Sequence, residues 1–142
     1  MNETIRKFGW PATLIKEFDH WVVLLRPAQP TLGSLVLAAK SDATAFGDLP
    51  GEAHAELKTI TAAIEAALRD FTGYAKLNYL MLMMVDPHVH FHVIARYEGE
   101  REFGGVAFAD AGWPGVPQLG DAVKPDERMR TALVAELTRR FG

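Results

Sequence analysis

The chain has 142 residues, of which 49% are hydrophobic and 23% charged, with a formal net charge of −3 and no cysteine. This composition is ordinary for a globular protein, so we expect one domain spanning residues 1–142 and exclude a disordered chain. The charge argues against general affinity for nucleic acid. The missing cysteines exclude disulfides, thiolate metal sites and a cysteine nucleophile, and they fit a reducing cytoplasm.

Neither a secretory signal nor a membrane helix is predicted. The N-terminal stretch from Met1 to Lys7 lacks the apolar segment of a signal peptide. The longest apolar run, Leu80–Val85, is far shorter than the roughly 20 residues that a membrane helix needs. We therefore expect a cytoplasmic protein that does not bind membranes.

Short strands are predicted in the N-terminal third of the chain. Residues 1–12 are expected to form an arm, followed by strands over Thr13–Phe18 and His20–Arg26. The second strand holds a continuous apolar run, as buried strands do. A loop with two prolines and a glycine then spans Pro27–Gly33, and a further strand, antiparallel to the last, is expected over Ser34–Ala39.

The middle of the chain changes to the period of an amphipathic helix. From Pro50 to Phe71, apolar residues recur every three or four positions. Glu52 suits the positive end of the helix dipole, and Gly73 suits the left-handed position after the last turn. We expect this helix to cover one face of a sheet.

The C-terminal half is predicted to hold two strands, a long loop and a helix. The strands are expected over Lys76–Val85 and from the histidine run to about Tyr97, paired as a hairpin in the sheet centre. Residues 98–123 are rich in glycine and are expected to be irregular. Pro125–Phe141 has helical spacing. The predicted fold is therefore α+β: an antiparallel sheet of about five strands, with a long helix across it and a C-terminal helix beside it.

Three of the five histidines alternate with apolar residues in the run His88–Ile94. On a β-strand, residues two apart share a face. We therefore predict that His88, His90 and His92 form a ladder on one surface. The residues between and after them, Val89, Phe91 and Val93, are then expected to face the core.

Such a ladder suits two kinds of chemistry. A pair of histidines can bind a metal ion, but the outer two of three lie about 13 Å apart, too far for one ion to bind both. A neutral imidazole can instead attack phosphorus while its neighbours donate hydrogen bonds. His90, with a histidine on both sides, is the natural nucleophile. Histidines that are merely buried and hydrogen-bonded are a third interpretation, less suited to three in strict alternation.

The run His88–Ile94 resembles the signature of the histidine triad superfamily, His-φ-His-φ-His-φ-φ, at every position. The resemblance extends over most of residues 13–97. It implies a nucleotide hydrolase or transferase that forms a nucleotidyl-histidine on His90, with His88 and His92 positioning the nucleophile and the phosphate. Dinucleoside polyphosphates and nucleoside phosphoramidates are the implied substrates, and a homodimer with one continuous sheet is the implied assembly. No cofactor is expected.

Two positions depart from the family's pattern. Ser34 stands where many members carry a further histidine, and Met84–Pro87 replaces a Gly-Gln-Ser/Thr phosphate-binding run. Ser34 is kept among the candidate nucleotide-binding residues. The missing phosphate-binding run leaves open a second hypothesis, a nucleotide-binding module or sensor of the same fold without turnover.

Further candidate nucleotide contacts lie outside the triad. Asn78 is expected either to hydrogen-bond ribose or phosphate or to pair with adjacent backbone. Arg26, with Lys76 and Arg101, is expected either to neutralise phosphate charge or to remain solvated. Trp113 has a flat face that any base can stack on, or it pins its loop to the body.

Overall fold

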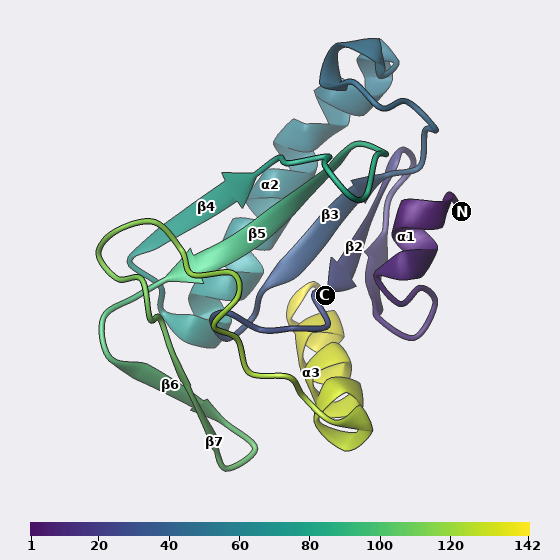
Figure 1. Cartoon of the computed structure of the whole chain (residues 1–142). Helices are drawn as coiled ribbons and strands as arrows, with labels where there is room; N and C mark the ends of the chain where they lie inside the picture. The colour runs from purple at the N-terminus through teal and green to yellow at the C-terminus, as the bar shows by residue number, and fades with distance from the viewer.

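The computed structural model describes all residues, 1–142, and contains a five-stranded antiparallel sheet of order β1-β2-β3-β5-β4 (Figure 1). Its strands are β1 (Leu14–Glu17), β2 (Trp21–Leu25), β3 (Leu35–Ala39), β4 (Lys76–Leu80) and β5 (His90–Arg96). The helices are α1 (Glu3–Lys7), the 3₁₀ turn η1 (Phe46–Asp48), α2 (Gly51–Thr72) and α3 (Glu127–Arg140). The predicted α+β fold is confirmed.

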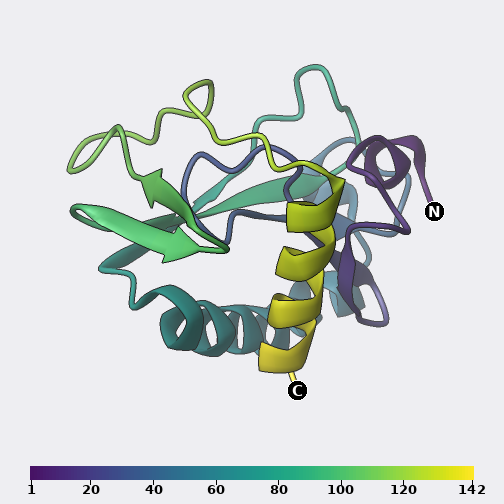
Figure 2. The ribbon, with the colours of Figure 1, turned by 90° about the horizontal axis from the view of Figure 1, so that it is seen from below.

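The long helix covers one face of the sheet, as expected. Helix α2 buries a stripe that includes Ile60, Ile64 and Leu68, and it ends at Gly73 in the left-handed conformation, with φ 61°. Figure 2 shows α2 below the sheet and α1 on the opposite side. Helix α3 contacts β1, β2 and α2.

None of the helices combines the length and hydrophobicity that a membrane span needs.

The two faces of the sheet differ in what covers them. Toward α2, alternate residues of the strands join an 18-residue core cluster that includes Trp21, Leu37 and Val93. On the other face a smaller cluster of Ile5, Val22, Leu24, Val36 and Ala38 packs under α1. Helix α1 therefore covers the β1–β3 half of the second face, and the β5–β4 half is not covered by a helix.

The strand before the histidine run is shorter than predicted. It ends at Leu80, and residues 81–89 form a loop in which Met83 has a left-handed φ of 44°. The Val89 N–H bonds to the Ala43 carbonyl rather than to β4. The loop explains why β5 begins only at His90. The predicted central hairpin is also wrong: β4 and β5 do pair, but β4 is an edge strand and β3 is central.

Two segments predicted to be irregular have regular structure. Residues 98–123 contain a hairpin of β6 (Glu100–Phe103) and β7 (Val106–Ala109). Its turn, Gly104–Gly105, has φ values of 59° and 79°, which only glycine adopts easily and which suit a two-residue hairpin. The N-terminal arm contains α1, whose first turn is capped by the Asn2 side chain.

Candidate active site

His90 and His92 lie side by side on the sheet face opposite α2. Their ring centroids are 5.1 Å apart with the planes at 80°, and the residues are 2% and 7% exposed. Phe91 and Val93 belong to the α2 side. The predicted alternation along the strand is thus confirmed from residue 90 onward.

The hydrogen bond of His90 fixes which ring nitrogen carries its proton. His90 Nδ1 lies 2.8 Å from the carbonyl oxygen of His88. A carbonyl oxygen only accepts hydrogen bonds, so Nδ1 of a neutral ring must be the protonated nitrogen. The lone pair of Nε2 is then free to act as a nucleophile or base.

His92 has the opposite arrangement. Arg26 Nε donates to His92 Nδ1 over 3.2 Å, so the proton of the neutral ring is on Nε2. Burial, the nearby Arg26 charge and His90 lower the pKa of His92 to about 4, against a smaller opposing effect of Asp86. His92 is therefore uncharged at neutral pH and presents an N–H donor.

His88 does not join the ladder. It precedes β5, and its ring Nδ1 bonds to the Asp42 carbonyl, 3.0 Å away. The prediction that three imidazoles share one strand face is therefore wrong for His88, because the loop before β5 ends only at Val89. In this structure His88 contacts His90 through its backbone carbonyl, which accepts the hydrogen bond from His90 Nδ1.

Residues at and after α1 cover the two histidines. The Phe8 ring centroid lies 5.5 Å from that of His90 and 5.7 Å from that of His92. The His88 N–H donates to Thr4 Oγ1 over 3.3 Å, and Lys7 pairs with Asp86 at 2.7 Å. These contacts could not be predicted from local sequence patterns, because they join positions more than 75 residues apart.

A cleft of about 500 Å³ lies along β4 and β5. Leu80, one of its lining residues, pairs in register with His92, so the cleft starts beside the histidines. Asn78, Lys76 and Trp113 also line it. The structure therefore brings together three of the candidate nucleotide contacts, Lys76, Asn78 and Trp113, in one cleft.

The far wall of the cleft is anchored by a buried arginine. Arg96 Nε donates to Asp110 at 2.7 Å, its NH1 donates to Asn78 Oδ1 at 2.8 Å, and its NH2 donates to the Gly115 carbonyl at 2.8 Å. Arg96 and Asp110 are 4% and 8% exposed. The network ties the Trp113 loop to the sheet and uses the oxygen of Asn78, which leaves the Asn78 amide nitrogen to face the cleft.

Two of the candidate nucleotide-binding residues make structural contacts within the protein instead. Ser34 is fully buried, and its hydroxyl donates to the Thr31 carbonyl at 2.8 Å, so it is not available to a nucleotide. Arg101 lies over the Tyr97 ring at 4.4 Å and donates to the Thr72 carbonyl. Ser34 was a candidate through the family's pattern and Arg101 through its charge, and neither observation indicated these partners.

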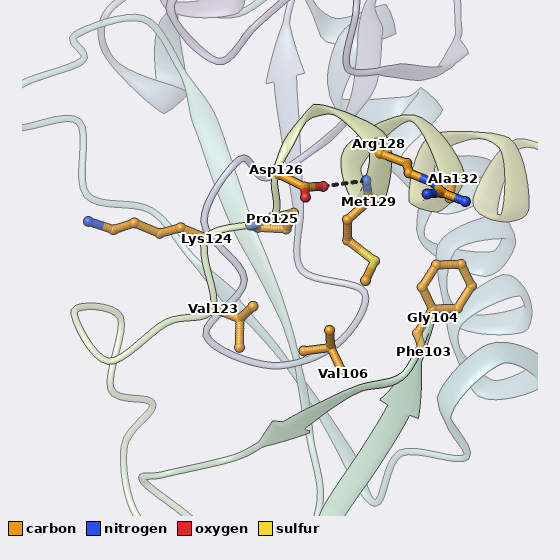
Figure 3. Close-up of a pocket in the computed structure, with 10 residues that line it drawn as sticks. All are labelled: Phe103, Gly104, Val106, Val123, Lys124, Pro125, Asp126, Arg128, Met129 and Ala132. Carbon is orange, nitrogen blue, oxygen red and sulfur yellow. Dashed lines mark hydrogen bonds between the residues drawn. The ribbon is translucent and has the colours of Figure 1, made fainter.

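A larger cavity than this cleft, about 820 Å³, lies elsewhere, between the β6–β7 turn and the start of α3. Figure 3 shows Met129 pointing into it, Lys124 pointing away, and Asp126 bonded to the backbone of Met129 as the helix cap. No histidine lines this cavity. The side chains that can act as nucleophile and hydrogen-bond donor are His90 and His92. The sheet face opposite α2, which carries them, is therefore the candidate active site.

The family model described as HIT domain matches residues 8–99, which include the whole sheet and both histidines of β5. The chain belongs to the histidine triad family. No protein with a curated functional description matches it.

Solved histidine triad proteins share the fold over nearly the whole chain. One from Sinorhizobium meliloti is 25% identical, with a TM-score of 0.75 over 99% of this chain and 95% of its own. One from Bradyrhizobium japonicum is 21% identical, with a TM-score of 0.71 over 100% and 97%. A hypothetical histidine triad nucleotide-binding protein from Sulfolobus tokodaii is 15% identical, with a TM-score of 0.70 over 97% and 89%.

Proposed function

We propose that this histidine triad protein hydrolyses, or transfers nucleotidyl groups from, nucleotides with a substituted α-phosphate. A nucleotidyl-histidine on His90 is the intermediate. The observation that carries the proposal is the bond from His90 Nδ1 to the His88 carbonyl, which leaves the Nε2 lone pair free. Dinucleoside polyphosphates and nucleoside phosphoramidates are the candidate substrates.

The reaction proceeds in two displacements. His90 Nε2 attacks the α-phosphorus, a nitrogen–phosphorus bond forms, and the bond to the leaving group breaks with its electron pair. The leaving group takes a proton from solvent. Water, or an acceptor hydroxyl, then attacks phosphorus, the electron pair of the nitrogen–phosphorus bond returns to His90, and the attacking oxygen loses its proton. The Nε2–H of His92 donates to a non-bridging oxygen, which gains charge in both transition states.

The cleft along β4 supplies groups for the rest of the substrate. The Asn78 amide nitrogen is a hydrogen-bond donor for ribose or phosphate, Lys76 is an exposed cation, and Trp113 offers an aromatic face. Because the net charge is −3, binding of a phosphate depends on such local groups rather than on the overall field.

The proposal includes a homodimer in the cytoplasm. Strand β4 is an unpaired edge, and the loop that follows it exposes Leu82, Met84 and Val85 at 50%, 84% and 80%. An open edge beside exposed apolar side chains favours association with another chain. The nucleotide substrate and the lack of cysteine favour the cytoplasm.

A nucleotide-binding module without turnover is the second candidate. The specific observation in its favour is the loop before β5, where exposed Met84 and Val85 replace the family's Gly-Gln-Ser/Thr phosphate-binding run. Such a protein is expected to bind AMP tightly and to release no product.

The substitution His90→Asn separates these functions. The asparagine amide can still donate to the His88 carbonyl, but no nitrogen remains at the position of Nε2. We expect product release from diadenosine polyphosphates and from adenosine phosphoramidate to fall by more than about 10³-fold, since covalent catalysis is lost. AMP binding, measured by calorimetry, should persist.

The matched control is His54→Asn on α2, where the ring packs on Phe46 away from the triad, and its turnover should stay at the wild-type level. Near wild-type turnover in His90→Asn would refute the mechanism. Tight AMP binding by a wild-type protein that turns over neither substrate would favour the binding module.

A further inference from the structure

Arg26 reaches His92 across an intervening strand. It follows the last residue of β2, and its backbone N–H still bonds to Ser34 at 2.9 Å, so it continues the β2–β3 ladder. In register, Leu24 pairs with Val36, and Val36 pairs with His92. Arg26 has the same parity as Leu24 and shares its face of the sheet. Neighbouring strands are about 4.8 Å apart, so the β2 and β5 backbones are about 10 Å apart, and the Arg26 and His92 side chains bridge this gap over β3 together with their hydrogen bond.

We propose that Arg26 is a positioning residue: it fixes His92 in the tautomer that presents Nε2–H to the phosphate, next to the free Nε2 of His90. The inference rests on the proposed function for its catalytic consequence. Its structural part, the proton position on His92, does not require turnover.

The chemistry of the contact allows only one tautomer. A guanidinium has five N–H donors and no acceptor, so His92 Nδ1 must accept from Arg26 Nε. Arg26 makes the only hydrogen bond to His92 Nδ1. Without Arg26 the proton of the neutral ring would be free to occupy either nitrogen.

The guanidinium is itself held in place. Arg26 NH1 donates to the Ala28 carbonyl at 2.7 Å, and the buried Gln29 side chain donates to the Arg26 carbonyl at 2.6 Å. The first bond orients the planar group, and the second holds the backbone from which it extends. A lysine at this position would keep the charge but not the oriented Nε–H.

The two histidines therefore have complementary roles set by their Nδ1 partners. His90 Nδ1 donates to a carbonyl, which leaves a lone pair on Nε2, and His92 Nδ1 accepts from a guanidinium, which leaves a proton on Nε2. The charged and titratable groups that face His92 are Arg26 from the end of β2, His90 from β5 and Asp86 from the loop before β5. Among these, Arg26 is the group that both bonds to His92 and disfavours its protonation.

The test compares the tautomer and titration of His92 in wild type and in Arg26→Met, which has similar length but neither donor nor charge. In long-range ¹H–¹⁵N spectra of histidine-labelled protein, wild-type His92 should carry its proton on Nε2 and should not titrate above pH about 5, about one unit above its pKa. In Arg26→Met we expect both tautomers and a titration midpoint at least one pH unit higher. An unchanged tautomer and midpoint would overturn the inference.

Kinetics and controls complete the test. With an adenosine phosphoramidate, Arg26→Met should lower kcat by about 10²-fold, the usual effect of losing one oriented donor, and Arg26→Lys should restore part of the loss. Arg101→Met removes an arginine that stacks on Tyr97 and should leave the His92 spectrum unchanged. If Arg26→Met does not fold, Arg26→Leu, which also lacks a donor and a charge, takes its place, with the same expected result and the same overturning result. Absence of turnover in wild type would refute the proposed function but not the tautomer assignment.

Discussion

At the scale of single residues, the buried His92 makes stability depend on pH. The pKa of His92 is lowered from 6.5 to about 4 in the folded chain, chiefly by burial and then by Arg26. Between these two values the unfolded chain binds more protons than the folded one, so stability falls as the pH falls from 6.5 to 4 and does not depend on His92 above that window.

The substitution His92→Gln removes this titration. Between pH 7 and pH 4, the wild type should lose about 2 kcal/mol more free energy of unfolding than His92→Gln, after allowance for solvent screening. Urea unfolding at a series of pH values measures the difference. Parallel stability curves for the two proteins would contradict the prediction.

The sequence predicted the alternation of His90 and His92 with core residues, because strand geometry depends only on spacing. It did not predict the partner of His92, since Arg26 lies 66 residues earlier and meets it only through the β2–β3–β5 register. The position of His88 was missed for a different reason: the Val89 N–H bonds to Ala43, so the strand pairing does not extend back to His88.

At the scale of secondary-structure elements, α1 and the residue after it control access to the nucleophile. His90 is only 2% exposed, with the Phe8 ring at 5.5 Å. We therefore expect Phe8 to limit the access of a phosphate to His90 Nε2. The contacts of Thr4 and Lys7 with the loop before β5 couple movement of Phe8 to α1 as a whole.

The substitution Phe8→Ala should therefore expose His90. We expect carbethoxylation of His90 by diethylpyrocarbonate to become at least about threefold faster than in wild type, as followed by mass spectrometry of the triad peptide, since reaction with the reagent requires an open ring nitrogen. Phe103→Ala, which removes a phenyl ring that packs on Phe71, is the control and should leave His90 unchanged. Equal rates in wild type and Phe8→Ala would show that Phe8 does not gate the site.

The long helices were predictable and the short elements were not. Helix α2 has a full apolar stripe, whereas α1 has five residues and depends on the tertiary contacts of buried Ile5. The β6–β7 hairpin had a local signal in the Gly104–Gly105 pair between its two short strands. The glycine-rich surroundings concealed it.

At the scale of the whole molecule, the open edge at β4 determines how two copies would meet. The edge strand and the exposed Met84 and Val85 form one continuous margin of the molecule. Pairing of two β4 edges would bury these side chains and join two five-stranded sheets. The sequence indicated this assembly only through the family resemblance, because edge strands cannot be identified before the strand order is known.

Negative charges introduced at Met84 and Val85, beside the β4 edge, should prevent two copies from associating. We expect wild type to sediment as a dimer and the double variant Met84→Glu/Val85→Glu to sediment as a monomer with unchanged circular dichroism. Buried like charges across a two-fold axis are unfavourable by several kcal/mol. Val106→Glu, which places the same charge on the β6–β7 hairpin, should remain dimeric. A monomeric wild type at micromolar concentration would refute the predicted assembly.

The strict alternation along β5 also constrains how this protein can evolve. A shift of β5 by one residue would turn His90 and His92 into the core beneath α2 and would expose Phe91 and Val93. An insertion or deletion in this strand would therefore remove the reactive side chains and disrupt the packing in a single event. Sequence change within β5 is therefore restricted to substitutions that keep this alternation.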